Sequence, residues 1–289
     1  MKGYVFITGA AGGLGKAFAV ECASRGWNLF LTDLSQDALS KIAVSLTNTY
    51  GVEVITEACD LTEPASRLSL FDSIKEKNLN FRCLVNVAGV DHEGPFFEKT
   101  RDQIRNIIRV NIEATLDITR GILEFRSSNT PFRLVNVSSL ASFYPMPVKA
   151  TYAASKRFLL DFSLALREEL KPLGGTVTVL CPGGLPTTKE AIMAIDAQGF
   201  LGRITTKNVG YVAARTIDHA LKGHAVYIPG IFNKILQFTC SIVPPGIAAY
   251  FLCKRWMRSY RKWSGHKPYH ARSEDGAYHS RGCVPLENN

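Results

Sequence analysis

Tyr152 and Lys156 lie four residues apart in the stretch Tyr152-Ala153-Ala154-Ser155-Lys156, which opens a strongly amphipathic pattern. On a helix this spacing places the phenol and the ammonium on one face, a turn apart. A tyrosine with its reference pKa of about 10 is a poor base at neutral pH, and a nearby cation lowers that pKa by stabilising the phenolate. Ser139 lies upstream, where its hydroxyl can hold a carbonyl or alcohol oxygen while Tyr152 exchanges the proton. These residues predict acid/base chemistry at such an oxygen.

A glycine-rich stretch near the N-terminus, Thr8 to Gly15, reads T-G-A-A-G-G-L-G and follows directly on an apolar run. Gly9 permits a tight turn, Gly13 lets a pyrophosphate approach the backbone, and Gly15 lets a helix pack closely on a sheet. A helix that starts here offers free N–H groups and a positive dipole to phosphates. Because a glycine pattern gains meaning from a strand before it and a helix after it, we predict a dinucleotide site. The alternative is a glycine-rich turn without a ligand.

Asp33 ends the next apolar run, eighteen residues after Gly15. An acidic side chain at this point can accept both ribose hydroxyls of an adenosine and repels a 2′-phosphate. Gly12 and Leu34, the nearby positions, carry no positive charge that would favour a 2′-phosphate. The sequence therefore favours NAD(H) over NADP(H), the alternative being a solvated carboxylate at a strand end.

The elements that must position these residues alternate along the chain. Seven short apolar runs are expected as strands: Tyr4–Thr8, Leu29–Thr32, Val52–Glu57, Cys83–Val87, Arg133–Val137, Thr176–Leu180 and Ala225–Ile228. Amphipathic patterns near 13–25, 36–49, 64–77, 101–126, 151–171 and 207–221 are expected as helices. Largely apolar strands that alternate with helices are typical of a parallel sheet covered on both faces. We predict one α/β domain over residues 1–230, a doubly wound sheet whose ligand crevice lies at the carboxyl ends of the strands.

The motifs and their order along the chain resemble those of the short-chain dehydrogenases/reductases over residues 3 to about 230. The family's T-G-x-x-x-G-x-G is Thr8 to Gly15, and its Y-x-x-x-K is Tyr152 to Lys156. The other matches are Asp60-Leu61 for the adenine contact, Asn86-Val87-Ala88-Gly89 for N-N-A-G with a departure at Val87, Asn111 and Ser139 for the catalytic Asn and Ser, and Pro182-Gly183-Gly184-Leu185-Pro186-Thr187 for P-G-x-x-x-T. The resemblance implies a Rossmann fold of about seven strands.

The resemblance also implies roles for individual residues. Tyr152 is the acid/base, and Ser139 orients the substrate oxygen. Lys156 lowers the pKa of Tyr152 and binds the nicotinamide ribose, and Asn111 positions a water that relays protons to Lys156. The implied cofactor contacts are Thr8, Gly9, Gly13, Leu14, Gly15, Asp33, Asp60, Leu61, Asn86, Ala88, Gly89, Tyr152, Lys156, Pro182, Gly183, Leu185 and Thr187. The expected reaction is hydride transfer between NAD(H) and a secondary alcohol/ketone pair.

Residues 188–206 follow the last of these motifs and contain Ile192, Met193, Ile195, Phe200 and Leu201. In the family this region is a mobile lid over the substrate. Its apolar content predicts an apolar ketone or alcohol, such as a steroid, an oxoacyl chain or a retinoid. The alternative is that these side chains pack on the sheet.

The composition is that of a globular protein: 289 residues, 46% hydrophobic and 20% charged. It excludes a disordered chain, a collagen-like fibre and a polytopic membrane protein. The seven cysteines are an odd number without a C-x-x-C pair, and we expect reduced thiols. The first apolar stretch is too short for a signal peptide, so we expect a cytoplasmic protein. We predict no metal site.

The chain beyond residue 230 departs from the α/β alternation. Ile235 to Cys253 is nineteen residues without formal charge, but Pro244-Pro245-Gly246 interrupts it. Cations and aromatic residues follow, from Lys254 to Trp263. We expect 231–263 to be an apolar, then basic and aromatic extension and 264–289 to be a polar, flexible tail. For 235–263 three interpretations stay open: an anchor on the cytoplasmic face of a membrane, packing on the protein or a second subunit, and a spanning segment.

The resemblance and the charge distribution also bear on the partners of the protein and on rival functions. The resemblance implies a homodimer or homotetramer through the helices near 101–126 and 151–171. We predict no nucleic-acid partner, because the net charge of +9 lies mainly in the tail and the body has no matching basic surface signal. One rival function is a redox sensor that holds the dinucleotide without turnover, and another is a membrane scaffold. An intact Asn-Ser-Tyr-Lys set argues against the sensor, which needs no proton relay.

Overall fold

A seven-stranded, all-parallel sheet forms the centre of the protein. The computed structural model describes residues 3–128, 130–187, 189–197, 199–264, 270–272 and 278–280. The strands of the central sheet are β1 Tyr4–Thr8, β2 Leu29–Asp33, β3 Val54–Ala58, β4 Phe81–Asn86, β5 Arg133–Val137, β6 Thr176–Leu180 and β7 Val226–Tyr227. Their order is β3-β2-β1-β4-β5-β6-β7. The expected doubly wound, Rossmann-type sheet of seven strands is confirmed.

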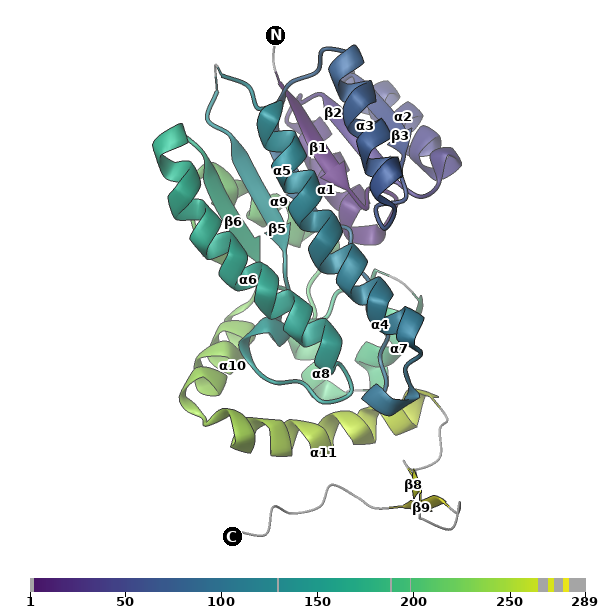
Figure 1. Cartoon of the computed structure of the whole chain (residues 1–289). Helices are drawn as coiled ribbons and strands as arrows, with labels where there is room; N and C mark the ends of the chain where they lie inside the picture. The colour runs from purple at the N-terminus through teal and green to yellow at the C-terminus, as the bar shows by residue number, and fades with distance from the viewer. Residues whose placement is uncertain are drawn as a thin grey trace.

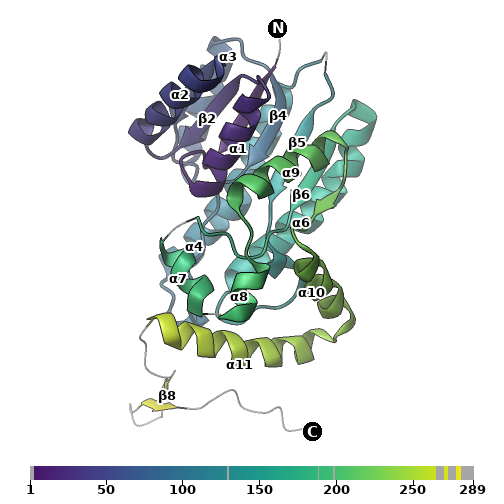
Figure 2. The same cartoon turned by 180° about the vertical axis from the view of Figure 1, so that it is seen from behind.

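Helices cover both faces of this sheet, which explains why the strands are apolar on both sides. Seen in Figures 1 and 2, α1, α2 and α9 lie on one face, and α3, α4, α5 and α6 lie on the other. Their bounds are α1 Gly13–Ser24, α2 Gln36–Tyr50, α3 Pro64–Glu76, α4 Arg101–Ile108, α5 Thr115–Glu124, α6 Ala150–Leu170 and α9 Val209–Leu221. The rings of Phe6, Phe30 and Phe81 pack together on three adjacent strands, and all three are fully buried. Burial of this kind is the main stabilising contribution to the sheet.

The strand order reverses between β1 and β4, which pair in parallel in the middle of the sheet. Crossover connections leave these two strands on opposite faces of the sheet, and in doubly wound sheets the loops at the carboxyl ends diverge at such a reversal, which is where ligands bind. The glycine-rich loop follows β1, and the residues from Val87 onward follow β4. The sheet therefore directs both segments to the same edge.

Most elements match the expected ones, with ends displaced by one or two residues. The largest difference is the helix expected over 101–126, which is α4 and α5 joined by a π-helical turn, η2 Arg109–Ala114. The lid region 188–206, for which no helix was expected, contains α7 Lys189–Ala197 and α8 Phe200–Thr205. Two short strands, β8 His270–Arg272 and β9 Tyr278–Ser280, pair within the expected polar tail, most of which lies outside the described residues.

The C-terminal extension forms two helices beyond the carboxyl ends of the strands. They are α10 Ile231–Ile242 and α11 Pro245–Ser264, and α11 runs across the bottom of the molecule in Figure 1. The break falls at Val243 and Pro244, where prolines prevent one continuous helix. Among the residues with a described placement, no helix combines the length and the apolarity that crossing a bilayer requires.

Candidate active site

The first turns of α6 carry Tyr152 and Lys156 at the edge of the sheet where β5 ends. Lys156 is buried, and its Nζ donates a hydrogen bond of 2.9 Å to the carbonyl oxygen of Val137, the last residue of β5. Ser138, the next residue, donates from Oγ to the carbonyl oxygen of Lys156 at 2.7 Å. Lys156 Nζ lies 5.7 Å from the ring centroid of Tyr152. These hydrogen bonds connect the start of α6 to the end of β5, and the phenol of Tyr152 and the amine of Lys156 lie on the same side of α6.

Ser139 follows directly and begins the short 3-10 helix η3, Leu140–Phe143. Its Oγ accepts a hydrogen bond of 3.1 Å from the backbone N–H of Ala141. The Ser139 hydroxyl also lies close enough to the phenol of Tyr152 to lower its pKa. Ser139 and Tyr152, which the sequence analysis predicts to contact the same substrate oxygen, are therefore adjacent.

Asn111 lies in the π-helical turn η2 and is fully buried. Its Oδ1 accepts from the N–H of Val90 at 2.8 Å, and its Nδ2 donates to the Val90 carbonyl oxygen and to Ser155 Oγ, both at 3.0 Å. A Cβ at Gly89 would stand 3.0 Å from Lys156 Nζ and 3.3 Å from Asn111 Oδ1. The segment after β4 therefore joins Asn111 to Lys156, and π-helical turns are frequent at functional sites.

Burial determines the pKa values of the two central groups. It raises the pKa of Tyr152, and the carboxylate of Asp91 raises it further, whereas Lys149 and Ser139 lower it. Burial lowers the pKa of Lys156 to about 8. The direction at Tyr152 is opposite to the one expected from Lys156 alone. The reason is that removal of the phenolate from water, together with the Asp91 carboxylate, outweighs the positive charge of Lys149.

A half-buried charge cluster beside Tyr152 was not expected from the sequence. Lys149 Nζ lies 2.5 Å from Asp91 Oδ2 and 2.6 Å from Glu93 Oε2. The same Nζ lies 5.7 Å from the ring centroids of Tyr152 and Trp256. The two carboxylates raise the pKa of Lys149, so it carries a full positive charge at neutral pH. No local spacing announces this cluster, because its members come from separate loops that only the fold brings together.

The glycine-rich loop presents the start of α1 to the crevice. The N-cap of α1 is Gly12, which makes no side-chain capping hydrogen bond, and the first turn of α1 holds no acidic residue. The first N–H groups of α1 are therefore left for an anion such as a pyrophosphate, as a dinucleotide requires. A Cβ at Gly13 would meet the main chain of Thr187 at 3.0 Å, so the loop after β6 lies against this turn.

Asp33 lies at the end of β2 and joins the glycine-rich loop to its own strand. Its Oδ2 accepts from the N–H of Ala11 at 2.9 Å, and its Oδ1 accepts from the N–H of Leu34 at 2.8 Å. The carboxylate therefore lies beside the turn where the adenosine half of a dinucleotide is expected. Leu14 and Gly15 follow the turn in α1, and both are buried.

The other expected cofactor contacts lie on loops at the same edge of the sheet. Thr8 Oγ1 accepts from the N–H groups of Val87 and Ala88 at 3.1 and 3.2 Å, which ties the ends of β1 and β4 together. Asn86 Nδ2 donates to Asn136 Oδ1 at 2.9 Å and joins β4 to β5.

Two further pairs of expected contacts come from the loops after β3 and β6. Asp60 Oδ1 accepts from the N–H of Thr62 at 2.9 Å, and Leu61 is buried. After β6, the carbonyl oxygen of Pro182 accepts from the N–H of Leu140 at 2.8 Å. A Cβ at Gly183 would stand 2.7 Å from the Thr205 carbonyl oxygen, and Leu185 packs against the core. The sequence-based set is thus distributed over the carboxyl ends of β1 to β6.

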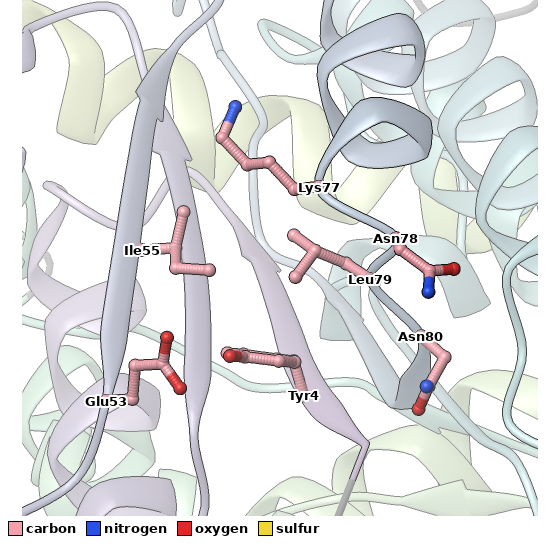
Figure 3. Close-up of a pocket in the computed structure, with 7 residues that line it drawn as sticks. All are labelled: Tyr4, Glu53, Ile55, Lys77, Asn78, Leu79 and Asn80. Atoms are coloured by element: carbon pink, nitrogen blue, oxygen red, sulfur yellow. The ribbon is translucent and has the colours of Figure 1, made fainter. Parts of the chain in front are cut away.

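A cavity of about 400 Å³ lies at the opposite edge, where the strands begin. Figure 3 shows the residues around it: Tyr4, Glu53, Ile55, Lys77, Asn78, Leu79 and Asn80. Burial and the Glu53 carboxylate raise the pKa of Tyr4 to about 12. Ligands of doubly wound sheets bind at the carboxyl ends of the strands, so we assign this cavity no part in the catalytic site.

Comparisons with known proteins identify the family. The sequence matches the short chain dehydrogenase family over residues 3–194. It is 32% identical to a very-long-chain 3-oxoacyl-CoA reductase of Phaeosphaeria nodorum, over 59% of this chain and 51% of that protein. It is 33% identical to the human 17-beta-hydroxysteroid dehydrogenase type 3, over 65% of this chain and 62% of that protein. The chain thus matches about half of the length of the first relative.

Among solved structures, a short-chain dehydrogenase from Sphingobium yanoikuyae in complex with NADPH is similar in fold and sequence. Its TM-score is 0.71 at 26% identity, covering 84% of this chain and 96% of that one.

Proposed function

Because this chain belongs to the short-chain dehydrogenase family, we propose that it is an NAD(H)-dependent oxidoreductase that interconverts a secondary alcohol and a ketone. The observation that carries the proposal is the adjacency of Ser139, Tyr152 and buried Lys156 at the edge of the sheet where the glycine-rich loop lies. A sensor or a scaffold has no use for a tyrosine placed beside a serine and a buried lysine, a set that serves proton exchange.

In the proposed mechanism, Tyr152 gives its proton to the carbonyl oxygen during reduction and takes it back during alcohol oxidation. Ser139 holds the same oxygen, because its hydroxyl lies next to the phenol. Lys156 would bind the nicotinamide ribose of a bound dinucleotide and support the phenolate, and Asn111 would hold the water that returns protons to Lys156. A nicotinamide dinucleotide supplies the hydride-transfer chemistry when bound. The N-terminus of α1 and Asp33 are the groups that would hold its pyrophosphate and adenosine ribose.

We propose an apolar substrate of the oxoacyl, steroid or retinoid type. Ile192 and Met193 in α7 are 46% and 51% exposed, on the segment that follows the P-G-x-x-x-T motif. Trp256 of α11 packs with Tyr152 in one apolar cluster. The relatives' names, a 3-oxoacyl-CoA reductase and a 17-beta-hydroxysteroid dehydrogenase, refer to substrates of this kind.

The test is a fluorescence titration with NADH combined with a panel of apolar and small ketones, followed by NADH absorbance. We expect saturable NADH binding and turnover on at least one apolar ketone. Saturable binding without turnover on any member of the panel would favour the sensor. A protein that binds no dinucleotide would favour the scaffold.

The preference for NADH over NADPH gives a first mutational prediction. In Asp33→Asn the negative charge that repels a 2′-phosphate is gone, while the side chain keeps its shape. We expect NADPH to bind about ten-fold more tightly than in the parent, as measured by fluorescence titration. Asp37→Asn, in the first turn of α2, changes charge equally nearby and serves as the control. A parent protein that binds NADPH more tightly than NADH would show the NAD(H) assignment to be wrong, and the neighbour with NADPH makes this a necessary measurement.

The charge cluster beside Tyr152 gives a second prediction, on the pH dependence. Alcohol oxidation needs the phenolate, so its rate rises as pH climbs through the pKa of Tyr152. Lys149→Met removes the cation that lowers this pKa, and Asp91→Asn removes the carboxylate that raises it. We expect the rising limb of the pH–rate profile to move up by about one pH unit in Lys149→Met and down in Asp91→Asn. If the rising limb moved in the same direction in both variants, the group that titrates in this limb would not be the Tyr152 phenol.

We further propose a cytoplasmic homodimer or homotetramer that touches a membrane through 235–263. Phe158 and Leu164 of α6 are 40% and 37% exposed, which supports a subunit contact on this helix. Sedimentation velocity of the protein and of Phe158→Glu tests that contact.

A further inference from the structure

Helix α10 is exposed almost throughout. Asn233 is the one buried residue of this helix, and its Nδ2 donates hydrogen bonds to the carbonyl oxygens of Thr205 and Pro229. Four large apolar side chains repeat at the i, i+4, i+7 and i+11 positions, which share one face of a helix. This face, called the α10 stripe below, consists of Ile231, Ile235, Phe238 and Ile242, which are 64%, 54%, 64% and 67% exposed. A contiguous apolar face on a surface marks an interaction site.

Helix α11 extends this surface with a second kind of side chain. Ile247 and Phe251 near its start are 50% and 65% exposed. Lys254, Arg255 and Arg258 are also exposed and fall on the same helical face, within about 100° of one another. The outward face of α11 is thus apolar at its start and cationic further on.

Charge decides which partner fits this surface. Residues 231–264 contain no Asp or Glu and six cations: Lys234, Lys254, Arg255, Arg258, Arg261 and Lys262. A second copy that docked symmetrically on the same surface would bring two such cationic segments together, and their positive charges would repel each other. An anionic bilayer attracts the cations at its headgroups and accepts the apolar stripe at the acyl boundary.

The opposite side of α11 closes over the catalytic residues. Trp256 lies in one apolar cluster with Tyr152 and Met146. Tyr260 is buried, and its hydroxyl donates to Glu98 Oε2 at 3.1 Å. Phe97, the residue before Glu98, is 83% exposed and adds an aromatic side chain at this end of α11. Figure 1 shows α11 running below the carboxyl ends of the strands, between the catalytic edge and the outside.

We propose that α10 and the outward face of α11 dock on an anionic lipid bilayer, so that an apolar substrate enters the site under α11 from the membrane. Docking rests on the exposed α10 stripe and on the cations of a segment that contains no acidic residue. The substrate path rests on the oxidoreductase function proposed above. Docking therefore has to be measured without using turnover.

The experiment uses the full chain and vesicles of phosphatidylcholine, either pure or with about one-third phosphatidylglycerol. The variant Ile235→Glu/Phe238→Glu places two charges in the α10 stripe. The control, Val44→Glu/Leu68→Glu, makes the same charge change at positions of α2 and α3 that are 61% and 62% exposed. Both pairs are at the surface, and NADH titration and thermal unfolding verify that each variant is folded.

We expect the parent and the control to sediment with the anionic vesicles and to bind pure phosphatidylcholine at least about ten-fold more weakly. The stripe variant should lose at least about ten-fold in affinity for the anionic vesicles. Docking is overturned if the stripe variant binds the anionic vesicles as tightly as the control does. It is also overturned if the parent does not bind the vesicles. In that case, an oligomer that dissociates in the stripe variant would assign the α10 stripe to a contact with a second copy.

The substrate path has its own readout. Once a ketone is accepted, anionic vesicles should increase turnover of a bilayer-partitioned ketone by the parent but not by the stripe variant. Turnover of a water-soluble ketone should be equal in both. Equal stimulation of both proteins would refute entry from the membrane. Vesicle binding without any turnover would leave docking intact and refute the oxidoreductase function instead.

Discussion

Tyr152→Phe is expected to lower turnover by about 10³-fold in both directions while NADH affinity stays within a few-fold of the parent. The substitution removes only the hydroxyl that exchanges a proton with the substrate oxygen. The ring keeps its place in the cluster with Ala153 and Trp256, so the fold and the cofactor site are preserved. Initial rates by NADH absorbance, together with fluorescence titration of NADH, measure the two quantities separately.

Tyr144→Phe is the matched control for this prediction, because Tyr144 packs in the same cluster, but the groups that shift its pKa besides burial are Cys240 and Arg255 rather than Ser139. It should retain turnover within a few-fold. If Tyr152→Phe kept substantial activity, the acid/base assignment would be wrong, and Ser139 or a bound water would have to move the proton.

The second large effect is expected at Gly15, where the helix meets the turn before it. A Cβ at this position would stand 2.0 Å from the Gly9 carbonyl oxygen and 2.8 Å from Ala10 Cα, and neither atom can move without moving the loop. Gly15→Ala should therefore weaken NADH binding by at least about ten-fold and lower the free energy of unfolding by about 3 kcal/mol. Titration and denaturant unfolding measure these effects.

Gly12→Ala tests whether any methyl group in the same loop has this effect. Gly12 has φ −73°, which alanine adopts readily, and its Cβ would meet only the Gly9 carbonyl oxygen, at 3.3 Å. NADH affinity should stay within a few-fold of the parent. Equal losses in the two variants would mean that the loop as a whole, and not the close approach at Gly15, limits binding.

Local patterns were sufficient to predict the seven strands, the crossover helices and the edge at which the site lies. The reason is that a strand buried on both faces must be apolar and a crossover helix must be amphipathic. The residue pattern of each element therefore reflects the environment in which it packs. The relation of Tyr152 to Lys156 could also be predicted, because four residues on a helix determine it. The glycine turn after β1 is likewise a local requirement of the backbone.

Other features of the site depend on contacts between segments that are distant in the sequence, and these features could not be predicted. The helix expected over 101–126 carries a π-helical turn that places Asn111 against Val90, and no local spacing distinguishes such a turn from regular helix. The direction of the Tyr152 pKa also depends on depth of burial, which a sequence does not express. Lys149 was unremarkable in the sequence, because its two carboxylate partners lie nearly sixty residues away.

The sequence by itself determined that this protein is a doubly wound α/β domain with a glycine-rich turn and a Tyr-Lys pair at one edge of its sheet. Only the tertiary structure decided that the half-buried Lys149 cluster lies against Tyr152 and that α11 closes over the site. It also decided that the apolar segment 235–253 turns at its prolines and leaves the α10 stripe facing outward. Periodicity identifies which side chains of a helix share a face, whereas packing determines what that face meets.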